Sequence, residues 1–396
     1  MKNKLKFVKF KDLLSGLVLC LAFVPAMIVK IFIRDFWLVC EDKNEARDNG
    51  YWFFKYVREN HKKQKIAYAI NKKAPDYQKV KNLGKVISFG SFSHWFWYLV
   101  ADKNISSQKS GKPNAAICYL FEVVLGLRKN NRVFLQHGIT INNVEFLYYK
   151  NTKMKRFCAS TYQEYEYLTK HFGYPDGHIK LTGFARFDNL LNCEVNKNQI
   201  LVMPTWRQWI AKGVEMKDIE GSNNFLESNY FKHWTEFLQN PELHKLLKQE
   251  NKQLVFYPHR NMQKYLENFN VSSENITIAS SKDYDVQELL KTSAMLVTDY
   301  SSVFFDVAYM KKPIVFYQFD EEMFRKHQYG EGYFDYKNNE LGLWAKTKED
   351  VVEHLKTIIK NKVQKENPDA VDKYFPYRDA ENSKRIYEMI KEINKK

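Results

Sequence analysis

The sequence has few cysteines, glycines and prolines, and each shortage excludes a class of protein. Its five cysteines are spread over 396 residues without a C-x-x-C pair, so neither a disulfide framework nor a zinc site is predicted. We therefore expect reduced thiols in a cytosolic compartment. With 15 glycines, 10 prolines and no internal repeat, the chain is not collagen-like, low-complexity or a solenoid.

Familiar ligand-binding signatures are also missing. The sequence has neither G-x-x-x-x-G-K-[ST] nor G-x-G-x-x-G, which weakens a P-loop or classical dinucleotide-binding interpretation. No basic–aromatic nucleic-acid module is recognisable, so nucleic acid is not an expected partner. Asp283 and Asp285 form a D-x-D pair, but Asp285 directly precedes a helical run and is interpreted as its cap. No cofactor or metal site is predicted, although the sequence is compatible with Mg²⁺.

Apolar residues and positive charge are abundant. Hydrophobic residues make up 44% of the chain and aromatic residues 16%, which is enough for a substantial core. The length predicts about two domains. Lys and Arg exceed Asp and Glu by 62 to 46, a net charge of +16. This surplus favours a polyanionic partner such as anionic lipid or a phosphate-rich substrate, with a basic surface kept for solubility as the alternative.

The N-terminus predicts a membrane-associating segment. An uncharged run from 13 to 29, interrupted by Pro25, is short for a spanning helix, which needs about 20 apolar residues. If it spanned, the preceding lysines would lie outside, against the positive-inside tendency. A helix or broken hairpin in the cytoplasmic interface satisfies both constraints. A true span, a buried helix and a signal peptide remain alternatives. The lysines expected on anionic headgroups are Lys4, Lys6, Lys9 and Lys11.

The rest of the chain alternates short apolar strands with amphipathic helices. Fully apolar strands in such an alternation predict parallel sheets covered on both faces. We expect two Rossmann-like domains facing a cleft. The predicted parts are a membrane-associating segment 1–34, an acceptor domain 35–196, a donor domain 197–380 and a basic helix 381–396. The predicted strands are 36–41, 65–70, 85–90, 132–138, 156–161 and 179–183, then 199–207, 253–260, 276–280, 294–299 and 313–317.

The segment LVTDYSSVFFDVAYMKKPIVFY, residues 296–317, places hydroxyls and a carboxylate where a strand becomes a helix. Ligands of parallel α/β sheets bind at the carboxyl ends of strands. Ser301 or Ser302 is expected at the N-cap, and the helix end can take a phosphate. Asp306 would lie one turn further, within reach of a ribose hydroxyl. A plain serine-capped helix is the alternative interpretation.

Other polar residues also follow predicted strands. In FLQHGIT, His137 and Gly138 stand at the carboxyl end of the predicted strand 132–138, and histidine suits proton transfer near neutral pH. In the second series, VFYPHR places His259 and Arg260 after a strand, and VMPTWR supplies Thr205 and Arg207. Arginine, histidine and threonine at neighbouring strand ends predict a phosphate-handling site. A lone histidine such as His137 would more often be structural.

Six segments together resemble the CDP-glycerol glycerophosphotransferase family, which includes teichoic-acid primases, polymerases and capsule-building relatives. They are EDKNEARDNGYWFFKYV, FLQHGIT, LTGFARFD, MPTWR, FYPHR and the segment 296–317, and the likeness covers about residues 36–340. The resemblance implies a GT-B fold and peripheral attachment to the cytoplasmic face of the membrane. It also implies transfer of glycerol phosphate from CDP-glycerol to an undecaprenyl-linked or polymeric acceptor, with release of CMP.

The resemblance also implies site residues. His137 matches the general base on the acceptor hydroxyl, and His259 matches a second histidine at the donor pyrophosphate. Gly138 and Thr140 lie on the acceptor side. The residues assigned to the donor are Thr205, Arg207, Arg260, Thr298, Asp299, Ser301, Ser302 and Asp306.

The sequence departs from the family around His137. The usual Trp-His-Gly-Thr is replaced by Gln136-His137-Gly138-Ile139-Thr140, so the acceptor is left open, as are the alditol, primase or polymerase action, and oligomeric state. The alternative enzyme is a GT-B glycosyltransferase using a nucleotide sugar for capsule or cell-wall glycan. A different class is a catalytically silent membrane scaffold that binds anionic polymer.

Overall fold

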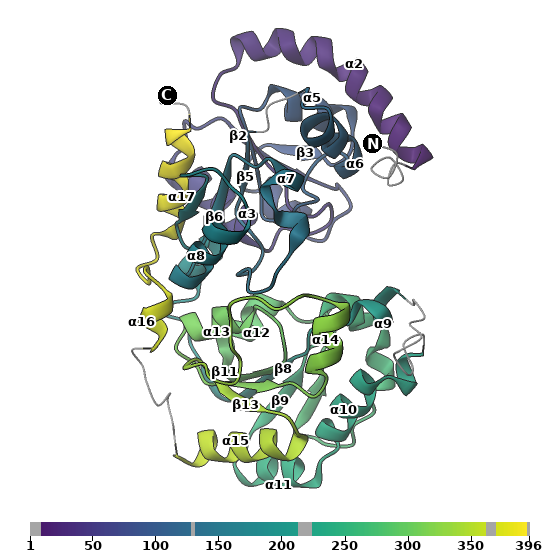
Figure 1. Ribbon diagram of the computed structural model, residues 1–396, viewed down its shortest axis with the longest axis vertical. Helices are drawn as coiled ribbons and strands as arrows, with labels where there is room; N and C mark the ends of the chain where they lie inside the picture. Colours follow the sequence, from purple (N-terminus) through teal and green to yellow (C-terminus); the bar gives the residue numbers. More distant parts are fainter. Residues whose placement is uncertain (1–8, 128–130, 213–223, 362–369, 394–396) are drawn as a thin grey trace. The chain divides into compact units, whose positions relative to one another are not determined.

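The computed structural model describes residues 9–127, 131–212, 224–361 and 370–393. Its contacts divide the chain into two units (Figure 1). Unit 1 comprises residues 1–139, 145–188 and 375–396, and unit 2 comprises 140–144 and 189–374. The predicted domain boundaries, which fall between residues 34 and 35, 196 and 197, and 380 and 381, remain predictions. Of the predicted lipid-facing lysines, Lys4 and Lys6 lie outside the described residues, and the side chain of Lys11 is not described either.

The described residues of unit 1 form a seven-stranded parallel sheet in the order β3-β2-β1-β4-β5-β6-β7. The strand order reverses between β1 and β4, which pair directly, with Val39 opposite Ile105. The strands are β1 Trp37–Val39, β2 Ile66–Ile70, β3 Val86–Ser88, β4 Lys103–Ser106, β5 Arg132–Phe134, β6 Arg156–Ala159 and β7 Ile179–Leu181.

Helices cover both faces of this sheet. On one face, Phe53 and Phe54 of α3 pack against Trp37 of β1 and Ile386 of α17. The C-terminal helix therefore completes the core of unit 1, as its amphipathic pattern predicts. On the other face, Trp95 of α5 packs against α2. The helices are α2 Phe10–Phe32, α3 Asn49–Asn60, α4 Tyr77–Lys81, α5 Phe92–Val100, α6 Ala115–Tyr119, η1 Leu120–Val124, η2 Glu145–Leu147, α7 Tyr149–Thr152, α8 Tyr162–His171, η3 Ala185–Asn189 and α17 Asn382–Glu392.

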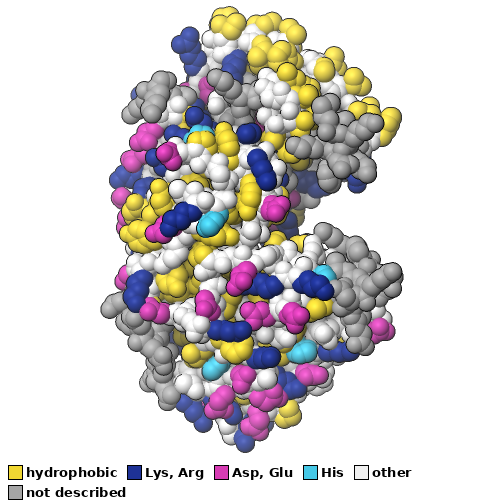
Figure 2. Space-filling view, viewed as in Figure 1, with side chains coloured by type: hydrophobic (Ala, Val, Ile, Leu, Met, Phe, Trp, Pro, Cys, Tyr) yellow, Lys and Arg dark blue, Asp and Glu magenta, His cyan; other side chains and the backbone are white. Residues whose placement is uncertain are grey.

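Helix α2 is continuous through Pro25 and lies along unit 1. Its buried stripe includes Leu19, Ala22 and Ala26 at helical spacing. The Trp95 indole of α5 donates to the Ser15 hydroxyl at 3.1 Å. The opposite stripe is apolar and exposed, and Figure 2 shows hydrophobic side chains gathered along this helix. Within the described residues, α2 is long and apolar enough to cross a membrane, with mean hydropathy 2.3 over Asp12–Phe32.

Unit 2 contains a six-stranded parallel sheet in the order β10-β9-β8-β11-β12-β13, within the residues described. Here the strand order reverses between β8 and β11. The strands are β8 Asn196–Met203, β9 Gln253–Phe256, β10 Ile276–Ile278, β11 Ser293–Thr298, β12 Ile314–Tyr317 and β13 Leu343–Ala345.

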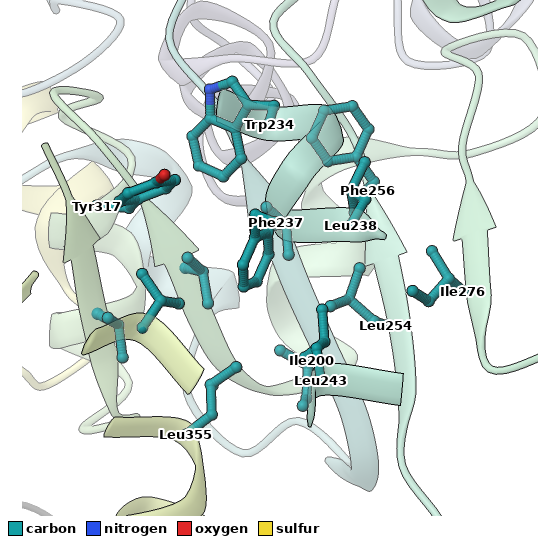
Figure 3. Close-up of a cluster of buried hydrophobic side chains, with 14 of the residues drawn as sticks. Ile200, Trp234, Phe237, Leu238, Leu243, Leu254, Phe256, Ile276, Tyr317 and Leu355 are labelled. Atoms are coloured by element: carbon teal, nitrogen blue, oxygen red, sulfur yellow. The ribbon is translucent and has the colours of Figure 1, made fainter. Parts of the chain in front are cut away.

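An apolar core fills one face of the unit 2 sheet (Figure 3). The indole ring of Trp234 on α10 contacts the rings of Phe256 and Tyr317, which lie on β9 and β12. The helices are α9 Gln208–Lys212, η4 Phe225–Glu227, α10 Asn229–Leu238, α11 Pro241–Gln249, η5 Arg260–Asn268, α12 Val286–Thr292, α13 Phe304–Tyr309, α14 Glu321–His327, α15 Lys348–Asn361 and α16 Ala370–Tyr374.

The prediction of two parallel α/β sheets is confirmed. Asp285 caps α12, as predicted, by accepting from the backbone N–H groups of Gln287 and Glu288. The predicted N-cap at Ser301 or Ser302 is wrong. Helix α13 begins at Phe304 after Val303, and the Ser301 hydroxyl accepts from the Val303 N–H at 3.4 Å in a local turn instead.

Candidate functional site

The loops that follow β8 and β11 meet where the strand order of unit 2 reverses. Residues 204–207 leave the carboxyl end of β8, and residues 299–302 leave that of β11. Ligands of open α/β sheets bind outside the carboxyl ends of the strands at such a reversal. This place brings most of the predicted donor residues together.

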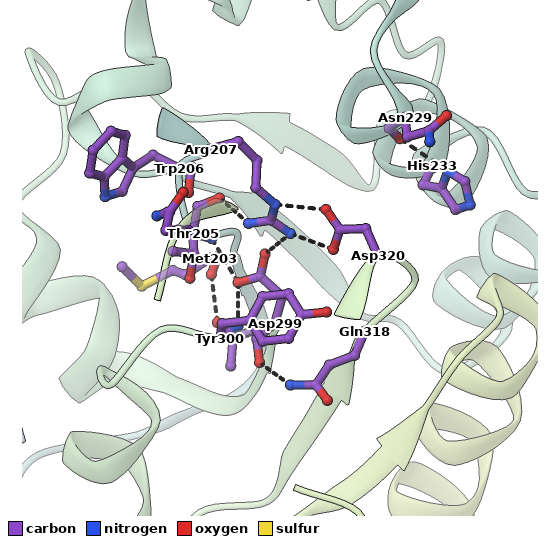
Figure 4. Close-up of polar contacts among 12 residues, drawn as sticks. Met203, Thr205, Trp206, Arg207, Asn229, His233, Asp299, Tyr300, Gln318 and Asp320 are labelled. Carbon is purple, nitrogen blue, oxygen red and sulfur yellow. Dashed lines mark hydrogen bonds and ion pairs between the residues drawn. The ribbon is translucent and has the colours of Figure 1, made fainter. Parts of the chain in front are cut away.

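A buried ionic network joins these two loops to the end of β12 (Figure 4). The Arg207 side chain is fully buried, and its Nη2 lies 2.9 Å from Asp299 Oδ2. Its Nε and Nη2 also donate to the two carboxylate oxygens of Asp320, at 2.8 and 2.9 Å. Burial disfavours the charged guanidinium, but Asp320 and Asp299 outweigh it and raise the pKa of Arg207. The arginine is therefore held as a cation between two carboxylates.

Asp299 also fixes the backbone around it. Its Oδ1 accepts from the N–H of Thr205 at 2.8 Å and from its neighbour Tyr300 at 2.7 Å. Its carbonyl accepts from Gln318 Nε2 at 3.2 Å, and Arg207 Nη1 donates to the Thr205 carbonyl at 2.9 Å. The network thus sets the positions of the β8 and β11 loops.

His259 adjoins the β8 loop from the end of β9. Its N–H donates to the Pro204 carbonyl at 3.1 Å, and its ring lies 6.0 Å from that of Trp206. Nδ1 accepts from the Asn261 N–H at 3.2 Å, so in the neutral imidazole the proton resides on Nε2. His259 is half-buried, and the adjacent Arg260 is exposed.

The predicted donor residues separate into buried and accessible ones. Arg207, Thr298, Asp299 and Asp306 are buried with 0–1% exposure, and the Thr298 hydroxyl donates to the Met203 carbonyl. The accessible polar side chains are those of His259, Arg260, Ser301 and Ser302. Thr205 is intermediate in exposure: the residue is 8% exposed, and its buried hydroxyl contacts the Asp299 carboxylate.

His137 lies in unit 1, in the loop after β5, and its side chain is exposed. Gly138 is in the same unit, whereas Thr140 belongs to unit 2. The preceding residue, Gln136, has φ 59°, in the left-handed region that a residue with a Cβ seldom adopts. The backbone that presents the histidine is therefore held in an unusual conformation.

Glu41 occupies the strand-order reversal of unit 1. Its carboxylate accepts from the Tyr68 hydroxyl at 2.5 Å, and from the Ser107 hydroxyl and the Gly50 N–H at 2.7 Å each. Burial, with the nearby Asp48 charge, raises the pKa of Glu41 to about 7. A Cβ on Gly50 would lie 2.6 Å from Glu41 Cγ, so the backbone approach requires glycine.

Several of these residues were not predicted from the sequence. Asp320 and Gln318 follow the predicted strand 313–317, and their position after a strand was the available signal. Asn49 and Arg186, which contact the His137 loop, lie within two of the quoted segments. No group of three or more His, Cys, Asp or Glu side chains able to hold a metal ion occurs in the described part of the chain.

Two units, each built on a parallel sheet covered by helices, are the architecture of the GT-B type. A model of the CDP-Glycerol:Poly(glycerophosphate) glycerophosphotransferase family matches residues 28–392, and the chain belongs to that family. The predicted family is thereby confirmed, and the predicted GT-B fold is confirmed by the likeness to the solved TagF polymerase.

The chain is similar to two curated proteins of Bacillus subtilis (strain 168). It is 31% identical over 370 residues to the minor teichoic acid biosynthesis protein GgaB, covering 90% of this chain and 40% of that protein. It is 26% identical over 336 residues to the teichoic acid poly(glycerol phosphate) polymerase, covering 77% and 41%. The chain thus spans about two fifths of the length of each.

A solved structure has the same fold. A variant of the wall teichoic acid polymerase TagF, soaked with CDPG, superposes with a TM-score of 0.68 at 17% identity, covering 96% of this chain and 94% of that one.

Proposed function

We propose that this chain transfers an alditol phosphate, glycerol phosphate in the first instance, from a CDP-alditol to a hydroxyl of a lipid-linked or polymeric cell-wall or capsule acceptor, releasing CMP. The observation that carries the proposal is the convergence of Thr205, His259 and the Ser301–Ser302 turn at the strand-order reversal of unit 2, in a chain of this family. CDPG in the soaked polymerase supports the choice of donor.

In this proposal the pyrophosphate of the donor binds the accessible groups of unit 2. His259 offers Nε2–H, because its Nδ1 already accepts from Asn261. Arg260 supplies the positive charge, and Ser301 and Ser302 supply hydroxyls. The Thr205 hydroxyl, which lies beside the Asp299 carboxylate, would donate to a phosphate oxygen when the donor binds.

The family resemblance implies that Arg207 binds the donor, but here we propose a structural role for it. Its guanidinium is fully buried and donates to Asp320 and the Thr205 carbonyl. We assign it, with Asp299, to holding the β8 and β11 loops. Asp306 is also buried, and contact with the ribose stays a proposal for that residue.

His137 acts as the general base of the reaction. The acceptor hydroxyl oxygen attacks the phosphorus on the alditol side, and its proton passes to the imidazole. The new phosphodiester bond forms as the bond from that phosphorus to the CMP oxygen breaks, and CMP leaves with the electron pair. Positioning and fixed positive groups supply most of such a transfer, and a base adds about 10²–10⁴-fold. The proposal assigns no cofactor and is compatible with Mg²⁺.

Helix α2 attaches the protein to the cytoplasmic face of the membrane in this proposal. Its buried stripe lies along α5 of unit 1, while Leu17, Leu21 and Val24 on the other side are 63–70% exposed. An apolar stripe beside a protein body suits a helix lying in the interface rather than crossing the bilayer. Anionic headgroups would meet the lysines at its start.

The test is a donor screen with product analysis. Full-length protein, vesicles containing anionic lipid and a synthetic lipid-linked acceptor are incubated with CDP-glycerol, CDP-ribitol or UDP-sugars. We expect CMP release and a phosphodiester-linked product by mass spectrometry with a CDP-alditol. UDP release alone would establish the nucleotide-sugar alternative. No turnover, with cellular polymer synthesis unaffected by His137→Ala and His259→Ala, would establish a silent scaffold.

A further inference from the structure

Three side chains outside the donor site make hydrogen bonds that hold the loop carrying His137. The histidine is exposed, but the residues around it are buried: Gln136 is 1% exposed and Asn49 0%. Gln136 has a positive φ of 59°, and an unfavourable backbone conformation persists only where surrounding contacts impose it. Those contacts can be identified.

Asn49 fastens the backbone on the N-terminal side of the histidine. Its Nδ2 donates to the Gln136 carbonyl at 2.6 Å and to the Leu135 carbonyl at 3.3 Å. Its Oδ1 accepts from the Arg186 N–H at 3.0 Å. Asn49 is the first residue of α3, and Asp48 caps that helix. The position of the loop is therefore set by the start of a core helix.

Arg186 fastens the histidine's own peptide. Its Nη1 donates to the His137 carbonyl and to Asp48 Oδ1, both at 3.0 Å. The guanidinium side chain is 6% exposed, so solvent does not compete strongly for these bonds. Asn49 and Arg186 are also bonded to each other through the Arg186 N–H. They form one connected clamp.

Gln136 provides the third attachment through its own side chain. Its Nε2 donates to the Cys158 carbonyl in β6 at 2.6 Å and to Glu164 Oε1 on α8 at 2.9 Å. Glu164 is itself fixed, because its Oε2 accepts from the Ser160 N–H at 2.8 Å. These bonds hold Gln136 in its left-handed conformation, and the chain direction there decides where the next side chain points.

We propose that Asn49, Arg186 and Gln136 are positioning residues that set the orientation of the His137 imidazole. None of the three is placed against the donor, and their described contacts are to the protein itself. The inference rests on the proposed function, in which His137 is the base. It adds that catalytic power depends on the clamp, since a small displacement of a reacting group can cost about 10²-fold in rate.

The experiment compares Asn49→Ala and Gln136→Met with Asn104→Ala in the full chain. Asn104 is a matched control, a buried asparagine on β4 of the same unit whose amide donates to the Tyr98 carbonyl instead. We expect kcat per folded molecule to fall by on the order of 10²-fold in the two clamp variants. KM for CDP-glycerol should stay within about twofold, because donor binding is untouched. The Asn104→Ala control should lose stability, but its kcat per folded molecule should not show the fall expected of the clamp variants.

A second measurement does not depend on turnover. Diethylpyrocarbonate modifies exposed imidazoles, and peptide mass spectrometry gives a separate rate for each histidine. We expect the rate at His137 to change in both clamp variants, while the rate at His259, in the other unit, stays that of the wild type. If one clamp variant does not fold, the other still gives both measurements.

The outcomes separate the two proposals. A wild type that turns over no CDP-alditol overturns the proposed function, while the modification rates still report on the clamp. An active wild type whose clamp variants keep both kcat and the His137 modification rate overturns this inference alone. Asn49→Ala, Arg186→Gln and their double variant complete the set. If kcat falls in the double variant about as much as in either single variant, the two residues act as one clamp. Fully additive losses of kcat would contradict this.

Discussion

The loop of His137 in unit 1 and the loops beside His259 in unit 2 occupy comparable places but are held by different chemistry. Both lie at the carboxyl ends of parallel strands. The first is fastened by two side-chain amides and one guanidinium that donate mainly to carbonyl oxygens, with the carboxylates of Asp48 and Glu164 as further acceptors. The second is held by a buried cation between two carboxylates. The same fold thus presents two histidines through two kinds of support.

The two kinds of support should respond differently when one of their side chains is removed. Removing one partner of a buried ion pair leaves an uncompensated charge, which costs about 3–5 kcal/mol. Removing one neutral hydrogen bond costs about 0.5–1.5 kcal/mol. We therefore expect damage in unit 2 to appear first as unfolding. Damage around His137 should appear first as lost turnover in a folded protein.

The largest effect is expected for Arg207→Ala. It leaves Asp299 and Asp320 buried without their cation, so unit 2 should lose about 3–5 kcal/mol of unfolding free energy. Urea unfolding followed by tryptophan fluorescence measures this, since Trp234 lies in the unit 2 core. Lys348→Ala, which breaks an exposed pair with Glu236, is the control and should lose less than about 1 kcal/mol. Equal losses in the two variants would contradict the comparison.

Glu41 sharpens the comparison because it is a buried carboxylate in unit 1. Its pKa of about 7 lies above the usual value of 4.5, so the folded state holds the proton more tightly than the unfolded state. Stability should be fully present below about pH 4.5 and fall as the pH rises to about 7, by up to about 3 kcal/mol. Glu41→Gln should lack this decline in urea unfolding across that range. Parallel pH curves for the two proteins would refute the assignment.

A smaller effect is expected for Thr205→Val, which tests the ligand-facing end of the unit 2 network. The Thr205 hydroxyl contacts the Asp299 carboxylate, which Arg207 and two backbone N–H groups also bind. Its loss should therefore cost little stability, below about 0.5 kcal/mol. Donor binding should weaken about tenfold in calorimetry with CDP-glycerol, the value of one hydrogen bond to a charged group. Thr298→Val removes a bond already made to Met203 and should instead cost about 1 kcal/mol of stability. The reverse pattern would place the ligand elsewhere.

A modest change in stability is expected for Gln136→Gly. Glycine relieves the positive φ by about 1 kcal/mol, while two side-chain bonds worth about 1 kcal/mol each are lost. Unfolding free energy should therefore fall by only about 1 kcal/mol, although the His137 loop loosens. A loss above about 3 kcal/mol would mean that the amide supports the unit 1 core rather than the loop.

The apolar pattern predicted most of both sheets, but it missed two strands. Strand β4 reads Lys-Asn-Ile-Ser, and all four residues are buried because β4 pairs with β1 and β5 at the centre of the sheet. No local pattern reveals that Lys103 will be buried there. Strand β13 is a three-residue strand at a sheet edge, and two of its residues are only half-buried.

Strand-end position predicted which loops converge in unit 2, but not which side chains remain accessible. Arg207 and Arg260 each follow a strand in the sequence. The first is buried because Asp299 and Asp320 come from neighbouring strand ends, and the second is exposed. This distinction depends on contacts between residues about a hundred positions apart in the sequence. Likewise, Asn49 and Arg186 stood in recognisable segments, but only the folded chain shows them on the His137 loop.

The place of α17 bears on how the protein is made. Ile386, Met389 and Ile390 complete a core whose other members come from the first 190 residues. A ribosome therefore synthesises all of unit 2 before it makes the helix that closes unit 1. Until then the apolar face of α3 that α17 covers has no partner from the C-terminal segment. A fragment ending near Tyr374 would keep that exposed face permanently.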